Sequence, residues 1–262
     1  MITFDFDDIQ HWWPKLSAHV SGLVPLTSAR VAICSGEPKY IEDASEIFFS
    51  KVYPEKARFN AIVAAWVKAQ TVAAYHGSRL DDADIASIAQ KGLNMLSTEC
   101  RRQCLRKKLS FDPRWREDKL DAVLKQLGAS QSWGNREGQV HATISRASLL
   151  KGFNHYLTHG SEFDQCVVSL LFGEKAKELL AEYGSPVLVK LAIPGEKALA
   201  AANPYRLISE SHNLVREIIH VWTYWLADPA FVVAKQEYDC GLIFYNDVSS
   251  EWISSIEKVA DH

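Results

Sequence analysis

The chain has 262 residues, a formal net charge of −3, 47% hydrophobic residues and 23% charged residues. This composition is typical of a globular protein with one large domain, or with one domain and a sizeable extension. The small net charge of −3 excludes a global electrostatic attraction to nucleic acid or to an anionic membrane, so such binding needs a local basic patch.

Three further features bear on the compartment. No apolar run approaches the roughly 20 residues that span a bilayer, and the acidic start MITFDFDDIQ lacks the basic segment of a signal peptide. The five cysteines are scattered, and Cys100 and Cys104 have no second pair at metal-ligand spacing, so no metal site is expected. We therefore expect a cytoplasmic protein with free thiols and no membrane contact.

Residues 1–70 predict a helical N-terminal extension. A short helix is expected at 6–16, broken at Pro14, and a strand at 29–34. From residue 41 to 70 the apolar residues recur at helical spacing, and Pro54 divides them into two helices because proline is costly inside a helix.

The stretch AAYHGSRLDDADIASIAQKGL combines a strand with a helix. Residues 71–75 predict a short buried strand, with His76 and Gly77 where that strand ends. A helix then begins near Asp81, whose side chain can cap free amide groups, and stops at Gly92. A polar His-Gly at the mouth of a strand, followed by a helix, is a common way to build a ligand-facing corner.

A dense basic run lies within residues 98–128, which predict two helices. Its five cations are Arg101, Arg102, Arg106, Lys107 and Lys108. The usual interpretation of such a run is a solvated helix face. The alternative is a phosphate-binding patch for RNA, DNA or a dinucleotide.

The later part of the chain mixes polar loops with short strands. Residues 155–164 hold two histidines, a tyrosine and two acids on a predicted loop, which indicates a site. Strands are expected at 186–193, 231–234 and 241–245, and a last helix or turn at 249–259. Because regular strand–helix alternation is absent, the pattern predicts an α+β fold with an antiparallel or mixed sheet. No GxGxxG, P-loop, HExxH or GxSxG motif supports the corresponding chemistries.

Three segments occur in a suggestive order: YHGSRL with IASIAQKGL, the tyrosine of HYLTHGSE, and the acids of QEYD before LIFYNDV. In this order they resemble the ADP-ribosyltransferase fold of the His-Tyr-Glu class, shared by diphtheria-type toxins and poly(ADP-ribose) polymerases. The resemblance covers residues 72–259, and its first segment is the most specific. It implies a split mixed β-sheet core over 71–262, with a basic helical insertion near 98–128, behind the helical extension 1–70.

The resemblance also implies an NAD site. His76 would hydrogen-bond the nicotinamide ribose, the backbone of Gly77 would hold the nicotinamide amide beside Ser78, and Tyr156 would stack on the ring. Glu237 would orient the ribose hydroxyl and stabilise the positive charge that develops as nicotinamide leaves.

The position of the catalytic acid stays open. Counting back from Val248, Asp239 fits about as well as Glu237, and Glu217 is a third candidate.

The function implied is an NAD-dependent mono-ADP-ribosyltransferase with a macromolecular acceptor, in a toxin or phage-defence role that requires a neutralising antitoxin protein. Nucleic acid (RNA or DNA), bound by the basic run 101–108, is the first candidate acceptor, and protein is the second. An alternative is a non-catalytic nucleic-acid-binding module with structural histidines. A hydrolase using Ser161, His159 and Asp164 is disfavoured, because residues so close in sequence rarely converge as a triad.

Overall fold

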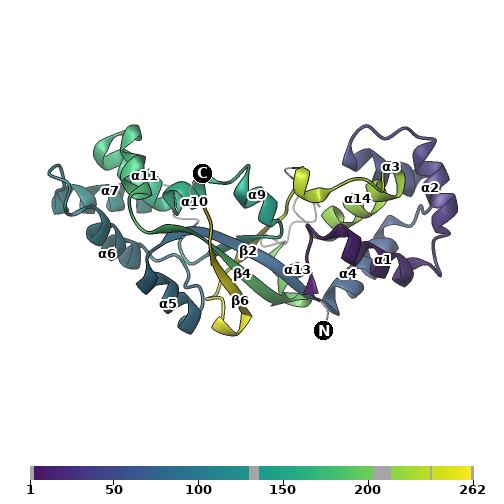
Figure 1. Cartoon of the computed structure of the whole chain (residues 1–262), viewed down its shortest axis with the longest axis horizontal. Helices are drawn as coiled ribbons and strands as arrows, with labels where there is room; N and C mark the ends of the chain where they lie inside the picture. Colours follow the sequence, from purple (N-terminus) through teal and green to yellow (C-terminus); the bar gives the residue numbers. More distant parts are fainter. Residues whose placement is uncertain (1–2, 130–135, 203–213, 237, 261–262) are drawn as a thin grey trace. The chain divides into compact units, whose positions relative to one another are not determined.

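A computed structural model describes residues 3–129, 136–202, 214–236 and 238–260 (Figure 1). The chain is α+β, with 56% helix and 16% strand, as the sequence predicts. The described strands form one open sheet of six strands in the order β5-β3-β2-β4-β6, with β1 paired to β2 off this path. The sheet is mixed, because β1 pairs with β2 in parallel and β4 with β6 in antiparallel orientation.

The strands are β1 (Thr3–Phe4), β2 (Thr71–Leu80), β3 (Val140–Thr143), β4 (Ser185–Pro194), β5 (Gly241–Phe244) and β6 (Ile253–Lys258). The helices are α1 (Ile9–Val20), α2 (Leu26–Cys34), α3 (Ile41–Lys51), α4 (Lys56–Lys68), α5 (Asp82–Lys91), α6 (Thr98–Leu109), α7 (Glu117–Ala129), α9 (Arg146–Leu150), α10 (His155–His159), α11 (Glu162–Phe172), α12 (Glu178–Ala181), α13 (Gly195–Ala201) and α14 (Leu214–Ala227). Short 3₁₀ helices are η1 (Glu174–Lys177), η2 (Val233–Lys235) and η3 (Ser250–Trp252). None of the described helices is long and apolar enough to cross a bilayer.

The chain divides into two compact units. The first comprises Met1–Ala74, Thr143–Ser148 and Ala192–Leu242, and the second comprises Tyr75–Ala142, Leu149–Leu191 and Ile243–His262. The candidate site described below belongs to the second unit alone.

The first unit is built around α14, which packs against α2, α3 and α4 (Figure 1). Trp222 of α14 is fully buried, and its ring centroid lies 5.6 Å from that of Phe48 and 5.7 Å from that of Phe59. The indole nitrogen of Trp222 donates to the hydroxyl of Ser17 at 2.9 Å, so the polar edge of the buried ring is satisfied. Pro54 separates α3 from α4 as predicted, whereas α1 continues through Pro14.

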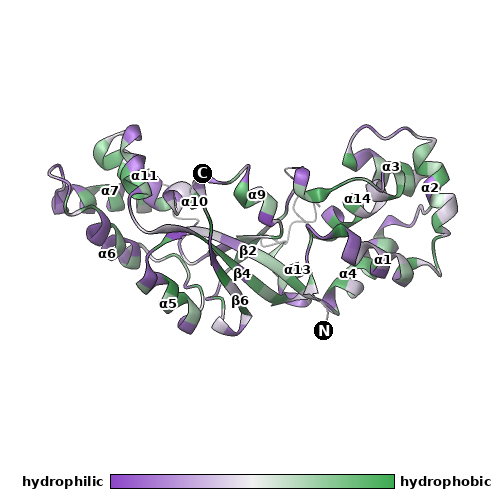
Figure 2. Ribbon diagram, viewed as in Figure 1, coloured by the Kyte–Doolittle hydropathy of each residue, from purple (hydrophilic) through white to green (hydrophobic). Residues whose placement is uncertain are grey.

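The second unit has an apolar cluster that holds α6, α7 and α11 together. Leu105 and Leu109 of α6, Leu120 of α7 and Val167 and Val168 of α11 are all fully buried in it. Leu105 and Leu109 are four residues apart and therefore share one face of α6. The rest of α6 is hydrophilic, as its colour in Figure 2 shows, whereas β4 is mostly hydrophobic. This packing fixes which side of the basic helix is turned inward.

The strand that carries His76 is longer than predicted. The expected end after Tyr75 is wrong, because β2 continues to Leu80 and places His76 and Gly77 inside the strand. From residue 75 onward the burial alternates, with Tyr75, Gly77 and Arg79 buried and the residues between them half-buried. The second half of β2 has polar residues on one face, so the continuous apolar run ends at Tyr75. The prediction followed that run and therefore ended the strand too early.

Three other sequence predictions are wrong. Residues 29–34 belong to helix α2, in which Ala29 and Ile33 are buried at a spacing of four. Within 249–259 the main element is strand β6, whose Ile256 pairs with Val189 of β4. Its half-buried isoleucines are three residues apart and mimic a helix. Residues 231–234 contain the start of η2 and no strand. For β6, the partner that decides the structure is strand β4, which is distant in the chain.

Candidate functional site

A cavity of about 300 Å³ lies within the second unit. Its walls come from the second half of β2, the stretch from α5 to α6, strand β3, and the α10–α11 segment. Six of the sequence-predicted site residues line it, namely His76, Gly77, Ser78, Arg101, Lys108 and Tyr156. Residues far apart in the chain are thus brought to one hollow.

His76 is held as a neutral imidazole. Its Nδ1 donates to the backbone carbonyl of His141 at 2.8 Å. Burial lowers the pKa of His76, since it disfavours the charged ring, and the positive charge of Arg101 adds to this, whereas the bond to His141 opposes it. With the proton on Nδ1, the ring keeps Nε2 as a hydrogen-bond acceptor.

His141 of β3 also lines the cavity and was not singled out from the sequence. Its Nε2 lies 2.9 Å from Oε1 of Gln139, to which it donates. Burial, followed by the positive charge of Arg136, lowers the pKa of His141 to about 4. The cavity therefore contains two imidazoles that are neutral at physiological pH. A lone histidine in the short strand VHAT gives no signal of this pairing, which depends on the neighbouring strand.

Gly77 is buried and tightly packed. A Cβ atom built on it would lie 3.2 Å from Cδ2 of Leu149 and 3.4 Å from Cδ2 of Leu157. A side chain at residue 77 would therefore have to displace both leucines by a few tenths of an ångström. Ser78, the next residue of β2, is half-buried.

Tyr156 lies on helix α10, so the predicted loop at 155–164 is in fact α10, a short connection and the start of α11. Burial, the charge of Glu162 and a hydrogen bond to Glu162 raise the pKa of Tyr156 to about 12. Glu162 also forms an ion pair with Arg136, and its carboxylate lies 3.5 Å from Nε2 of His155. Tyr156, Glu162 and Arg136 all line the cavity. Neither Arg136 nor a role for Glu162 was predicted from the sequence.

The two described candidate acids, Asp239 and Glu217, are not among the residues lining this cavity. Glu237 lies outside the described residues. Asp239 belongs to the first unit, where its Oδ1 accepts hydrogen bonds from the backbone of Ser145 at 3.0 Å and of Cys240 at 2.7 Å. Burial raises the pKa of Asp239 to about 6, against the effect of these bonds.

Glu217 also belongs to the first unit. It is 5% exposed and accepts from the guanidinium of Arg216 at 2.5 Å. Among the described residues, the carboxylates that line the cavity are those of Asp84 and Glu162.

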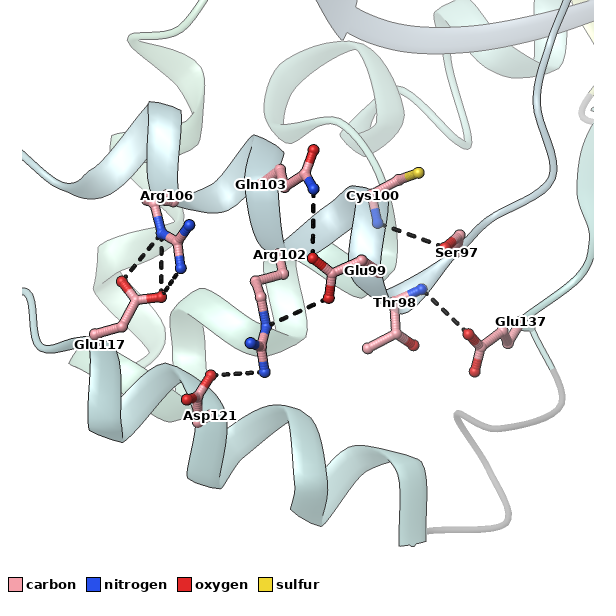
Figure 3. A network of polar contacts seen from close by, with 10 residues as sticks. All are labelled: Ser97, Thr98, Glu99, Cys100, Arg102, Gln103, Arg106, Glu117, Asp121 and Glu137. Carbon is pink, nitrogen blue, oxygen red and sulfur yellow. Dashed lines mark hydrogen bonds and ion pairs between the residues drawn. The ribbon is translucent and has the colours of Figure 1, made fainter.

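The cations of the basic run all have acidic partners. Arg102 contacts Asp121 of α7 at 2.7 Å, and Arg106 contacts Glu117 of α7 (Figure 3). Lys107 contacts Asp81 at 2.6 Å. These three residues do not line the cavity, and ion pairing reduces the positive potential that a helix of free cations would present to a polyanion.

Arg101 and Lys108 instead point inward and share one buried carboxylate. Asp164 is completely buried, and its Oδ1 accepts from Nε of Arg101 at 2.9 Å while its Oδ2 contacts Nη2 of Arg101. Nζ of Lys108 lies 3.6 Å from Oδ2. Burial would raise the pKa of Asp164, but the charges of Arg101 and Lys108 hold it below its usual value, so Asp164 is ionised.

No family model, curated protein or solved structure matches this chain.

Proposed function

We propose that the chain is an NAD-dependent mono-ADP-ribosyltransferase that transfers ADP-ribose from NAD to a macromolecular acceptor. The observation that supports this is the shared position of His76, Gly77, Ser78 and Tyr156, which all line one cavity. These are the four described residues to which the sequence resemblance assigns the binding of NAD. We propose likewise that residues 71–262 form an ADP-ribosyltransferase-like core.

The chemistry of the cavity suits this reaction. Nicotinamide is already cationic in NAD and leaves without a strong general acid, so the protein has to orient the ribose and stabilise an oxocarbenium-like centre. A neutral His76 with a free Nε2 can accept a hydrogen bond from a ribose hydroxyl. The ring of Tyr156 offers an aromatic face for the nicotinamide.

The acid that stabilises the developing positive charge is either one of the residues predicted from the sequence or a carboxylate that lines the cavity. Glu237 is the residue that the resemblance assigns, with Asp239 and Glu217 as the other candidates from the sequence. Glu162 is a carboxylate that lines the cavity beside Tyr156. Replacing Glu237 and Glu162 separately by glutamine distinguishes them, because only loss of the catalytic acid lowers kcat while NAD still binds.

A nucleic acid is the proposed acceptor, in a toxin or phage-defence role with an antitoxin partner. Protein is the second candidate acceptor. The ion pairs of Arg102, Arg106 and Lys107 support it, because they leave the exposed part of α6 with little uncompensated charge to attract a nucleic acid. They weigh in the same way against a non-catalytic nucleic-acid-binding module.

Labelled NAD incubated with the chain and, separately, with RNA, DNA or lysate protein tests the transfer. We expect label on one acceptor class with the wild type and none with His76→Ala. Absence of transfer to all three classes contradicts the proposal.

A further inference from the structure

We propose that Arg101 and Lys108 form a subsite for a phosphoryl group, the diphosphate of a dinucleotide, in the cavity of the second unit. The assignment of the ligand as a dinucleotide rests on the proposed function. The anion subsite itself rests on the unmatched donors of Lys108, which is buried, and of Arg101, which is half-buried, and does not need that function.

Lys108 is the first observation. Its side chain is 8% exposed and it lines the cavity. Its ammonium lies 3.6 Å from Asp164 and 4.8 Å from the centre of the Tyr183 ring, and it makes no hydrogen bond to another residue of the described chain. An ammonium has three N–H donors, and a buried charge without acceptors is strongly unfavourable. The ammonium therefore lacks the oxygen ligands that an anion in the cavity would supply.

Arg101 is the second observation. Two of its nitrogens, Nε and Nη2, are engaged by Asp164, and Nη1 makes no hydrogen bond within the described residues. One carboxylate thus serves two cations, which leaves a local excess of positive charge. Asp84 also lines the cavity and interacts electrostatically with Arg101, but it is engaged in the cap of α5, where it accepts from the backbone of Asp81 at 3.4 Å.

The ends of two helices add to this field. Ser97 caps α6 by accepting from Cys100 N, and Ser161 caps α11 by accepting from Asp164 N. Both serines line the cavity, so the positive ends of a 12-residue and an 11-residue helix lie at its wall. A helix start alone does not make an anion site, but here the two helix starts lie at the same cavity wall as the buried Lys108 and the half-buried Arg101.

The chemistry of these donors selects a phosphoryl group. A guanidinium and an ammonium that converge beside helix starts match the several oxygens and the high charge of a phosphate. A cavity of about 300 Å³ is of the size that takes a small ligand. His76 lines the same cavity, so a ligand that reaches from the cations to His76 carries a ribose or base next to its diphosphate.

Titration of the full chain with inorganic pyrophosphate tests the subsite. We expect saturable binding by the wild type, binding weaker by about tenfold or more in Lys108→Met, and near wild-type binding in Lys108→Arg. Lys125→Met, on the exposed side of α7, is the matched control and should bind as the wild type does. Because Asp164 keeps both of its contacts to Arg101 in Lys108→Met, this variant should remain folded.

The outcomes separate the two proposals. Failure of the wild type to bind pyrophosphate, or equal binding by Lys108→Met, overturns the subsite even if NAD is consumed. Pyrophosphate binding that depends on Lys108 without any release of nicotinamide retains the subsite and contradicts the proposed function. Competition by NAD but not by adenosine supports the dinucleotide as the ligand, whereas competition by a short RNA alone overturns that assignment. If Lys108→Met does not fold, the contrast between Lys108→Arg and Arg101→Lys decides. Arg101→Lys loses the unengaged Nη1 and should bind pyrophosphate more weakly than Lys108→Arg, and equal binding by the two variants overturns the subsite.

Discussion

Removing the charge of Asp164 should destabilise the second unit more than removing any exposed acid. In Asp164→Asn, the buried Lys108 and the half-buried Arg101 lose the carboxylate that they share, since Asp164 is completely buried and contacts both. Breaking a buried ion pair by removal of one partner costs about 3–5 kcal/mol. The exposed ion pair between Arg102 and Asp121 is worth only about 0.2–1 kcal/mol.

Urea unfolding measures this difference. Trp115 packs against the apolar cluster of α6, α7 and α11, so it is one of the chain's eight tryptophans whose fluorescence should change when the second unit unfolds. We expect Asp164→Asn to lower the free energy of unfolding by about 3 kcal/mol or more, and the matched variant Asp121→Asn by less than about 1 kcal/mol. Because the pKa of Asp164 is lowered in the folded chain, its contribution is present above pH 3.8 and is lost as the pH falls below that value.

A specific result would refute this reasoning. If Asp164→Asn unfolds within about 0.5 kcal/mol of the wild type at neutral pH, the two cations do not depend on the buried carboxylate. Added pyrophosphate provides a second check, because an anion that binds the same cations should restore part of the lost stability by mass action.

Two further substitutions give predictions of opposite sign. Gly77→Val should lower the free energy of unfolding by about 1–3 kcal/mol, because its methyl groups meet Leu149 and Leu157, and Gly77→Ala should lower it less. Equal urea midpoints for Gly77→Val and the wild type would show that the two leucines do not restrict the side chain at residue 77. Asp239→Asn should raise stability at pH 7.5, on the order of 2 kcal/mol, and should have no such effect below pH 3.8. The pKa of Asp239 is raised to about 6, so the folded chain binds the proton more tightly and loses stability as the pH rises from 3.8 through 6. Stability curves of the Asn variant and the wild type that run parallel between pH 4 and 7 would show that this carboxylate does not titrate in the folded state as described.

The sequence predicted best those features that depend on neighbouring residues. The start of α5 was predicted from Asp81, which accepts from Asp84 N at 2.7 Å, and its end from Gly92, whose φ of 87° favours glycine. Both features are contained within a single helical segment. The α+β class was likewise predicted from local patterns, because strand-like and helix-like segments are mixed without regular alternation.

The sequence could not reveal what depends on residues distant in the chain. The basic run was visible, but the partner of Arg101 is Asp164, 63 residues away, and this pairing decides which cations face inward. His141 became a site residue only through its contact with His76 of the neighbouring strand. Strand β6 was mistaken for a helix, because its register with β4 outweighs the spacing of its isoleucines.

Release of nicotinamide from NAD tests the central claim most directly. The assay contains the full chain, NAD and a mixture of RNA, DNA and lysate protein, and compares the wild type with His76→Ala and with His19→Ala, a change of an exposed histidine on α1. We predict release by the wild type and by His19→Ala, and a loss of at least about 100-fold in His76→Ala. No release by the folded wild type, or equal release by His76→Ala, would contradict the proposal that this cavity is an NAD site.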